Sequence, residues 1–175
     1  VKTPIILMGY LNPIERRGWD WYAQQSKIAG VDALLIVDLP PEEAQNAREL
    51  LNQHDLQLIS LLAPTTIGAR LSHACQQAQG YLYYVSMAGV TGKGLLQASN
   101  LKDRIEQIKL LSQVPVFVGF GIKDADTAKA CVEFADGVII GSALVSLLAE
   151  CTSVEACQKT VQQFLSPIRN AIDLV

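Results

Sequence analysis

Two apolar runs near the end of the chain stop at glycines that could bind an anion. Residues 114–122 read VPVFVGFGI, and residues 136–144 read DGVIIGSAL. Glycines after buried strands leave main-chain N–H groups bare, so an anionic ligand can approach them closely. A helix that begins at Ser142 would add the positive end of its dipole. The pattern predicts a phosphate site made by backbone amides rather than by lysine or arginine.

A third glycine-rich segment follows the apolar run at residues 81–85. It reads SMAGVTGKG over residues 86–94, and we expect it to form a lid in which Thr91 supplies a locking hydroxyl. Glycines also simply end strands and turn the chain, so one such loop would mean little. Three of them at strand ends favour phosphate binding.

Other strand ends carry polar and aromatic side chains. Asp38 follows a fully apolar run, where it either has a functional role or caps the helix expected to begin near Pro40. Tyr10 and Tyr83 could line a pocket for a flat aromatic substrate, or they could be core tyrosines with locally satisfied hydroxyls. Phe120, between two glycines, is expected to face the ligand or a neighbouring loop.

Residue sets for acid–base, nucleophilic or metal chemistry are missing from these loops. The sequence there has no paired carboxylates, no Ser/His/Asp set and no Cys/His set, and the chain has no HExxH or Walker motif. The two histidines lack metal-ligand spacing, so no metal is expected. The four cysteines form no CxxC pair and are predicted to be reduced thiols.

The composition is that of a compact, core-rich protein. Half of the 175 residues are hydrophobic, 18% are charged, and the net charge is −3. No basic block suggests a nucleic-acid surface, and no run suits a membrane span or a signal peptide. We therefore expect a cytoplasmic protein with no nucleic-acid or membrane partner.

Strands and helices alternate along the chain, which predicts a parallel sheet with right-handed crossovers. Strands are expected at residues 3–9, 33–37, 56–62, 81–85, 114–122 and 136–144, with a loop at 10–13. Helices are expected at residues 19–29, 40–52, 67–79, 101–111 (capped by Asn100), 124–134 (capped by Asp124) and 154–172, with a kink or break at Pro167.

Six βα units are fewer than the eight, over about 250 residues, of a closed barrel. The alternatives are an open doubly wound sheet or a barrel without its first two units. The chain begins at Val1 directly before a strand-like run, which favours the second alternative. We expect residues 1–175 to be a single partial (β/α)8 TIM-barrel domain that contains the third to eighth strands.

Six segments together resemble the tryptophan synthase alpha chain family, in that family's order and spacing. They are MGYLNP (8–13), LIVDLPPEE (35–43), LAPTT (62–66), YLYYVSMAGVTG (81–92), VGFGI (118–122) and GVIIGSA (137–143). The AGVTG and GFGI segments are specific in combination, and the resemblance runs from end to end of the chain.

The resemblance implies a lyase of tryptophan biosynthesis that cleaves indole-3-glycerol phosphate into indole and glyceraldehyde 3-phosphate. By motif match, the phosphate would lie against Gly92, Gly121, Gly141 and Ser142. The indole would lie near Met8, Leu35, Tyr83 and Phe120, with Tyr10 close by and Thr91 in the lid.

The resemblance also implies a partner. Asn12, Asp38 and Pro40 fall where the family meets its beta chain or arranges the loops that do. The implied assembly is an alpha2beta2 heterotetramer in which the beta chain carries pyridoxal phosphate and the alpha chain carries no cofactor.

The sequence departs from the family in one respect. The family's catalytic glutamate and aspartate belong to its second strand and the following loop, both of which would precede Val1. No residue here takes either role, so we expect this chain alone to be inactive. The alternatives are a non-catalytic phosphate-ligand-binding regulator of the beta chain and a sugar-phosphate isomerase or epimerase. The long loop at residues 86–94 and the aromatic lining argue against the isomerase or epimerase.

Overall fold

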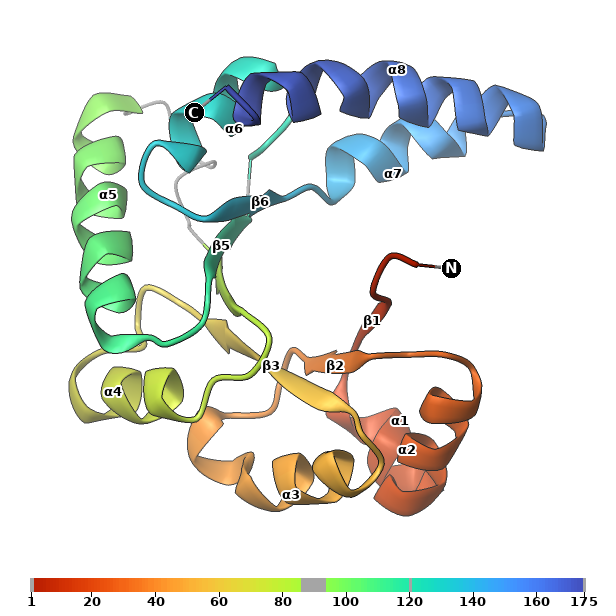
Figure 1. Ribbon diagram of the computed structural model, residues 1–175, viewed down its shortest axis with the longest axis vertical. Helices are drawn as coiled ribbons and strands as arrows, with labels where there is room; N and C mark the ends of the chain where they lie inside the picture. The colour runs from red at the N-terminus through yellow and green to blue at the C-terminus, as the bar shows by residue number, and fades with distance from the viewer. Residues whose placement is uncertain (1, 86–93, 120, 175) are drawn as a thin grey trace. The chain divides into compact units, whose positions relative to one another are not determined.

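The computed structural model describes the chain except for residues 1, 86–93, 120 and 175 (Figure 1). Its residues divide into two compact units. The first comprises Val1–Tyr83 with Leu111–Pro115, and the second comprises Tyr84–Leu110 with Val116–Val175. The single domain expected over residues 1–175 stays a prediction.

The first unit is a parallel sheet with helices packed on one of its faces (Figure 1). Its strands β1 (Ile6–Gly9), β2 (Ala33–Ile36) and β3 (Gln57–Leu62) pair in chain order. Its helices are α1 (Leu11–Arg17), α2 (Trp19–Ile28), the 3-10 turn η1 (Pro41–Glu43), α3 (Gln45–Gln53) and α4 (Gly68–Gln76). The alternation of strand and helix is the predicted βα construction.

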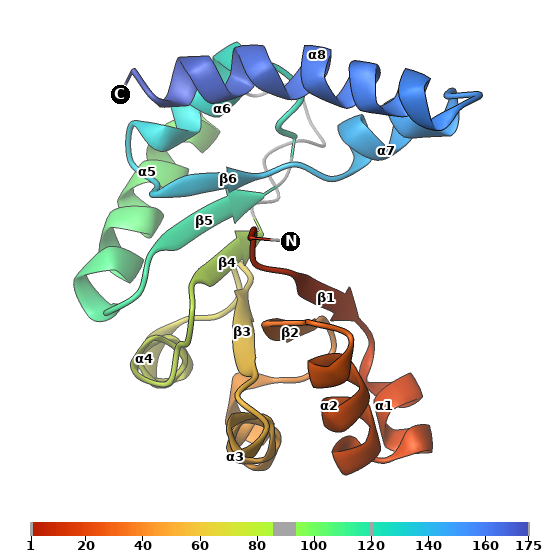
Figure 2. The ribbon, with the colours of Figure 1, turned by 45° about the vertical axis from the view of Figure 1, so that its right-hand side comes forward.

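The second unit holds the parallel pair β5 (Val116–Gly119) and β6 (Gly137–Ile139) (Figure 2). Strand β4 (Leu82–Val85) begins in the first unit and ends in the second. The remaining helices are α5 (Gly94–Leu111), α6 (Ala125–Val132), α7 (Ser142–Ala149) and α8 (Val154–Ile172). Helix α8 packs against α6 and α7.

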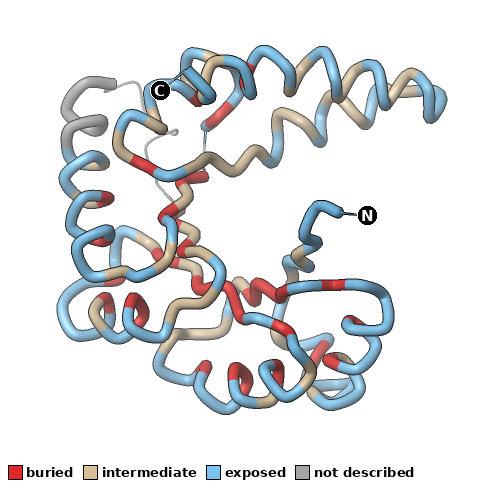
Figure 3. Tube along the Cα trace, viewed as in Figure 1, coloured by how far each residue is buried: buried red, intermediate tan, exposed pale blue. Residues whose placement is uncertain are grey.

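Strand β2 is buried on both faces, as its unbroken apolar sequence predicts (Figure 3). Leu34 and Ile36 belong to a core cluster that includes Leu51 of α3. Ala33 and Leu35 point to the other face and belong to a second cluster. The alternation follows from the two-residue period of a strand.

The second unit has its own core between α6 and α8. Ile122, Ala128 and Ile168 are buried there, and Phe164 and Ile172 pack against them. The three α8 positions are spaced four residues apart, so they lie on one face of that helix. This stripe explains why α8 packs along α6.

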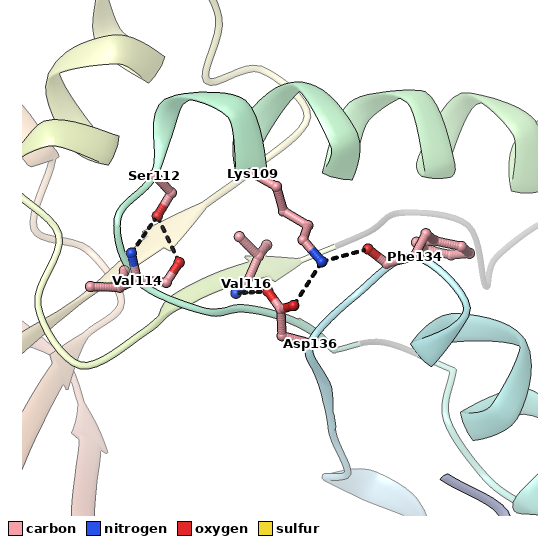
Figure 4. Close-up of polar contacts among 6 residues, drawn as sticks. All are labelled: Lys109, Ser112, Val114, Val116, Phe134 and Asp136. Carbon is pink, nitrogen blue, oxygen red and sulfur yellow. Dashed lines mark hydrogen bonds and ion pairs between the residues drawn. The ribbon is translucent and has the colours of Figure 1, made fainter. Parts of the chain in front are cut away.

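An aspartate at the start of β6 connects two strands and a helix (Figure 4). Asp136 Oδ2 accepts a hydrogen bond from the Val116 N–H at 2.8 Å, and the Asp136 N–H donates to the Val116 carbonyl at 2.9 Å. Lys109 Nζ donates to Asp136 Oδ1 at 2.7 Å and to the Phe134 carbonyl at 3.4 Å. Asp136 therefore fixes where β5 and β6 begin relative to each other.

The same device occurs at the start of β2. Asp32 Oδ2 accepts from the Ile5 N–H at 2.8 Å, and the Asp32 N–H donates to the Ile5 carbonyl at 2.9 Å. In both units an aspartate directly before a strand thus makes two hydrogen bonds to one residue at the start of the preceding strand. Gln79, which precedes β4, makes a similar contact with the preceding strand: its Oε1 accepts a hydrogen bond from the Leu58 N–H at 3.0 Å.

Two expectations about the first unit are wrong. Residues 10–13 are not a loop, because α1 begins at Leu11 and Pro13 lies in its first turn. A proline is tolerated there because first-turn N–H groups have no intrahelical acceptor. The helix expected over residues 40–52 is divided at Ala44 into η1 and α3.

Two expectations about the second unit also fail. Asn100 is not a cap, because α5 begins earlier, at Gly94. Pro167 does not break α8, which continues to Ile172. A proline removes one backbone donor, and the apolar stripe that packs on α6 outweighs that loss.

Replacing Asp136 tests the connection at the start of the strands. We expect Asp136→Ala to lower the free energy of unfolding by about 1 to 3 kcal/mol, because it leaves the Val116 N–H and the Lys109 ammonium without their partner. Asp136→Asn keeps an acceptor for the amide and should cost less. Asp103→Ala, a matched change at an exposed site, should have little effect. Urea unfolding followed by circular dichroism measures all three, and equal stabilities of the Asp136 variants and wild type would contradict the role.

Candidate functional site

The loops after β5 and β6 emerge at the same edge of the second unit. Gly119 is the register partner of Ile139 on the neighbouring parallel strand, so the carboxyl ends of the two strands lie side by side. Gly121 and Gly141, from the two predicted glycine loops, lie just beyond these ends and are exposed. The structure confirms that strand ends carry them, as the sequence predicts.

Gly121 has a backbone conformation that favours glycine. Its φ is +73°, in the left-handed region, and a Cβ placed there would meet nothing within 4 Å. A side chain is therefore disfavoured by the backbone rather than by crowding. The open space beside this main chain is what a close-approaching ligand needs.

Helix α7 begins without a side-chain cap. Gly141 occupies the N-cap position with φ −117° and ψ −95°, Ser142 is the first helical residue, and no side-chain hydrogen bond closes this end. The Val145 N–H donates to the Gly141 carbonyl at 3.1 Å, which is the first bond of the helix. The amides of residues 142–144 precede that bond and form the positive end of the helix dipole. Uncapped amides of this kind are suited to an anion.

Helix α6, which starts after β5, offers the opposite case. Asp124 Oδ1 accepts from the Thr127 N–H at 2.8 Å, and Thr127 Oγ1 accepts from the Asp124 N–H at 3.2 Å. The hydrogen bonds from Thr127 lower the pKa of Asp124. The chain's own carboxylate therefore occupies this end, as the predicted Asp124 cap implies. Of the two helix starts, α7 is the one left open to an external anion.

The aromatic-pocket candidates of the first unit share one face of its sheet. Met8 is the register partner of Leu35, so the two side chains lie on the same face. Leu35 is buried in the cluster against which Tyr83 packs half-buried, and burial raises the pKa of Tyr83. Met8 remains 60% exposed and Tyr10 64% exposed. The structure brings Met8, Leu35 and Tyr83 to one apolar face and leaves Tyr10 at its edge, as the N-cap of α1.

Asp38 caps a helix, but not the one that the sequence suggested. Its Oδ1 accepts from the Leu11 N–H, the first helical amide of α1, at 2.7 Å. The sequence offered a cap of the helix near Pro40 as one of two alternatives, beside a functional role, because residues 10–13 were expected to form a loop. Pro40 is the N-cap of η1, and Asn12 is exposed in the first turn of α1. These three candidates follow the ends of β1 and β2.

The sequence contained signals for α1 that could have revealed this cap. Pro13 suits a first helical turn, Arg16 and Arg17 suit a last turn, and Gly18 follows them. With α1 recognised, Leu11 becomes a free first-turn donor, and Asp38 at the end of the neighbouring strand becomes its natural acceptor.

The remaining site candidates, Gly92, Thr91 and Phe120, lie outside the described residues. Within the part of the chain that is described, no three or more His, Cys, Asp or Glu side chains gather as a metal site would require. No described helix has the length and apolar character needed to cross a membrane. The four cysteines are free thiols, of which Cys75 is buried.

Known proteins match the chain from end to end. The sequence profile of the tryptophan synthase alpha chain matches residues 1–173. The chain is 51% identical over 172 residues to the tryptophan synthase alpha chain of Xanthomonas oryzae pv. oryzae, a match that covers 98% of this chain. The chain belongs to the tryptophan synthase alpha chain family.

Solved structures of tryptophan synthase alpha chains agree with this assignment. The alpha chain of Legionella pneumophila superposes with a TM-score of 0.84 at 44% identity and covers 99% of this chain. The alpha2beta2 tryptophan synthase complex of Pyrococcus furiosus gives a TM-score of 0.80 at 28% identity over 97% of this chain. The chain therefore has an α/β fold of the TIM-barrel family, and the described residues hold six strands of an incomplete barrel, as predicted.

The chain is shorter than these tryptophan synthase alpha chains. It spans 64% of the length of both the Xanthomonas oryzae and the Legionella pneumophila proteins. The second unit, with the open start of α7, lies within the matched region, as does the apolar face of the first unit.

The occupied cap of α6 gives a pH-dependent prediction. The pKa of Asp124 is lower in the folded chain, so the charged cap stabilises the fold above the unfolded pKa of about 3.9, and this stabilisation is lost as pH falls through the folded pKa. Asp124→Ala should lower Tm by about 2 to 4 °C at pH 7. Asp124→Asn keeps an uncharged cap and should fall between the two. Thermal unfolding from pH 7 to about 3 measures this, and a gap between wild type and Asp124→Asn that widens on acidification would contradict the sign.

Proposed function

We propose that the chain forms part of an alpha chain of tryptophan synthase, a lyase that cleaves indole-3-glycerol phosphate to indole and glyceraldehyde 3-phosphate in tryptophan biosynthesis. The observation that carries the proposal is the end-to-end match to that family, at 51% identity with the Xanthomonas oryzae protein. Such a substrate is an apolar ring system joined to a phosphate, and each unit is considered by itself for one of these two groups.

The phosphate end of the substrate is assigned to the second unit. The first-turn amides of α7 lack a side-chain cap, and Gly121 offers uncrowded main chain after the neighbouring strand. Backbone amides at a helix start bind phosphate through directed N–H groups and the helix dipole. We assign the phosphate to Gly121, Gly141 and Ser142, with Gly92 as the fourth contact.

The indole end is assigned to the apolar face of the first unit. Met8, Leu35 and Tyr83 lie on that face, and a flat aromatic ring buries well against such side chains. Tyr10 and Phe120 complete the proposed lining, and Thr91 belongs to the proposed lid. The exposed sulfur-bearing chain of Met8 can adapt to a ring because it is unbranched and flexible.

The acid and base of the reaction are proposed to come from the third of the family's length that this chain does not span. Carbon–carbon cleavage here requires a carboxylic acid to protonate the indole carbon and a carboxylate near the indole nitrogen. The resemblance to the family implies that its glutamate and aspartate lie outside this chain. Asp38 is no substitute, because its carboxylate is engaged by the Leu11 N–H.

The partner of the chain is proposed to be the beta chain of tryptophan synthase, in an alpha2beta2 complex in the cytoplasm. The solved Pyrococcus furiosus complex, whose alpha chain resembles this one, supports that proposal. Asn12, Asp38 and Pro40 would meet this partner or hold the loops that meet it. Asp38 acts through α1, since it fixes the first turn that carries Asn12. Pyridoxal phosphate would belong to the beta chain.

The activity is tested by comparing the chain alone with a hybrid that joins it to the remaining third of the Xanthomonas oryzae protein. We expect no indole release from indole-3-glycerol phosphate by the chain alone and clear release by the hybrid. A folded hybrid without turnover, or turnover by the chain alone, would contradict the proposal. If the hybrid activates a beta chain without cleaving substrate, the result supports the alternative of a non-catalytic regulator.

The phosphate assignment is tested by placing a carboxylate at the start of α7. Ser142→Asp should stabilise the helix, because the negative charge meets the positive dipole end, yet it should repel a phosphate. We expect the affinity of the hybrid for glycerol 3-phosphate to fall by about tenfold or more. Isothermal titration calorimetry measures the affinity. Ser146→Asp, an exposed change one turn later, is the matched control, and equal weakening by both changes would contradict the assignment.

A further inference from the structure

Two of the four cysteines lie together around the first turn of α8. Cys151 follows α7, Ser153 caps α8, and Cys157 lies one turn inside it. Cys151 Sγ donates a hydrogen bond to the Leu147 carbonyl at 3.4 Å, and a side-chain interaction with Cys151 raises the pKa of Cys157. The two thiols therefore lie close to each other.

Both thiols line an open groove of about 660 Å³ beside α8. Val154, Val161 and Gln158 contribute to the same lining. Cys151 and Cys157 are half-buried, whereas Cys75 is buried and Cys131 sits elsewhere, in α6. A small reagent in this groove therefore has access to both cysteines.

The residues around the pair favour sulfur chemistry over metal binding. Structural zinc sites use four ligands of Cys, His, Asp or Glu. No cluster of three such groups exists among the described residues, so the pair has no further ligands there. Two neighbouring thiols within one chain can instead join, because a disulfide needs only a short approach of their sulfurs and suitable backbone spacing.

We propose that Cys151 and Cys157 are a dithiol site that low-molecular-weight disulfides, such as oxidised glutathione, convert to an intramolecular disulfide. Nothing in the proposed lyase activity requires this site. The disulfide would tie the turn after α7 to the first turn of α8, the two helices that pack together in the second unit.

The reaction balances as two thiol–disulfide exchanges. The Cys151 thiolate attacks one sulfur of the small disulfide. That S–S bond breaks, and one small thiol leaves. Cys157 then gives up its proton and attacks Cys151 Sγ, which releases the second small thiol. The protein dithiol loses two electrons, and the small disulfide gains them.

The pKa of Cys157 sets the expected pH dependence of the second exchange. The side-chain interaction with Cys151 and burial raise that pKa, so Cys157 is mostly the neutral thiol near pH 7. Only the thiolate attacks a disulfide, so closure should accelerate as pH rises toward and past the ordinary thiol range.

The sequence provides a direct test by mass spectrometry. The full chain is incubated with oxidised glutathione, quenched with acid, and cleaved at glutamate; Glu155 lies between the two cysteines. We expect a peptide from the Cys151 side joined to one from the Cys157 side, which separate on reduction. Two separate glutathione adducts on these sites, or no modification of either, would overturn the proposal.

Serine variants make the order of steps visible. In Cys157→Ser the mixed disulfide on Cys151 has no resolving thiol, so it should accumulate about tenfold above the wild-type level. Cys131→Ser should leave the joined peptides unchanged. Circular dichroism confirms that each variant is folded. If Cys157→Ser accumulates no more adduct than wild type, the two thiols do not act as a pair.

Discussion

The register between neighbouring parallel strands is the constraint on which both site regions depend. A shift of one residue between β5 and β6 would move the loops after them apart and turn inward side chains outward. Asp136 resists that shift because its carboxylate and its N–H both bind Val116. Asp136 acts at the amino ends of β5 and β6. Because it fixes their register there, it also brings together their carboxyl ends, which lead to Gly121 and the start of α7.

The first unit uses the same arrangement for another purpose. Asp32 holds the residue before β1 by the same two hydrogen bonds, and the register that follows pairs Met8 with Leu35. The apolar face of that unit is therefore a consequence of a polar contact at the strand starts. In each unit the stabilising contacts lie at one end of the strands and the functional candidates at the other, which is the usual division in β/α barrels.

Much of the fold and part of the site could be predicted from sequence because the signals are local. Apolar β-branched runs bounded by glycine mark the strands, and Asp124 marks the start of α6 through a pattern within four residues. The partner of Asp38 is harder to predict, because it requires both the recognition of α1 and a contact between residues 27 apart. The break expected at Pro167 is wrong for a related reason, because the packing of α8 on α6 cannot be inferred from the local sequence.

The main-chain phosphate site is the central claim, and nuclear magnetic resonance of the hybrid tests it most directly. The amide resonances of Gly121, Gly141 and Ser142 are followed while glycerol 3-phosphate is added. The account predicts that all three shift along one binding curve, while the amides of Ala125 and Asp126, at the occupied start of α6, stay in place. Shifts at α6 without shifts at α7, or separate binding curves for Gly121 and Ser142, would contradict it.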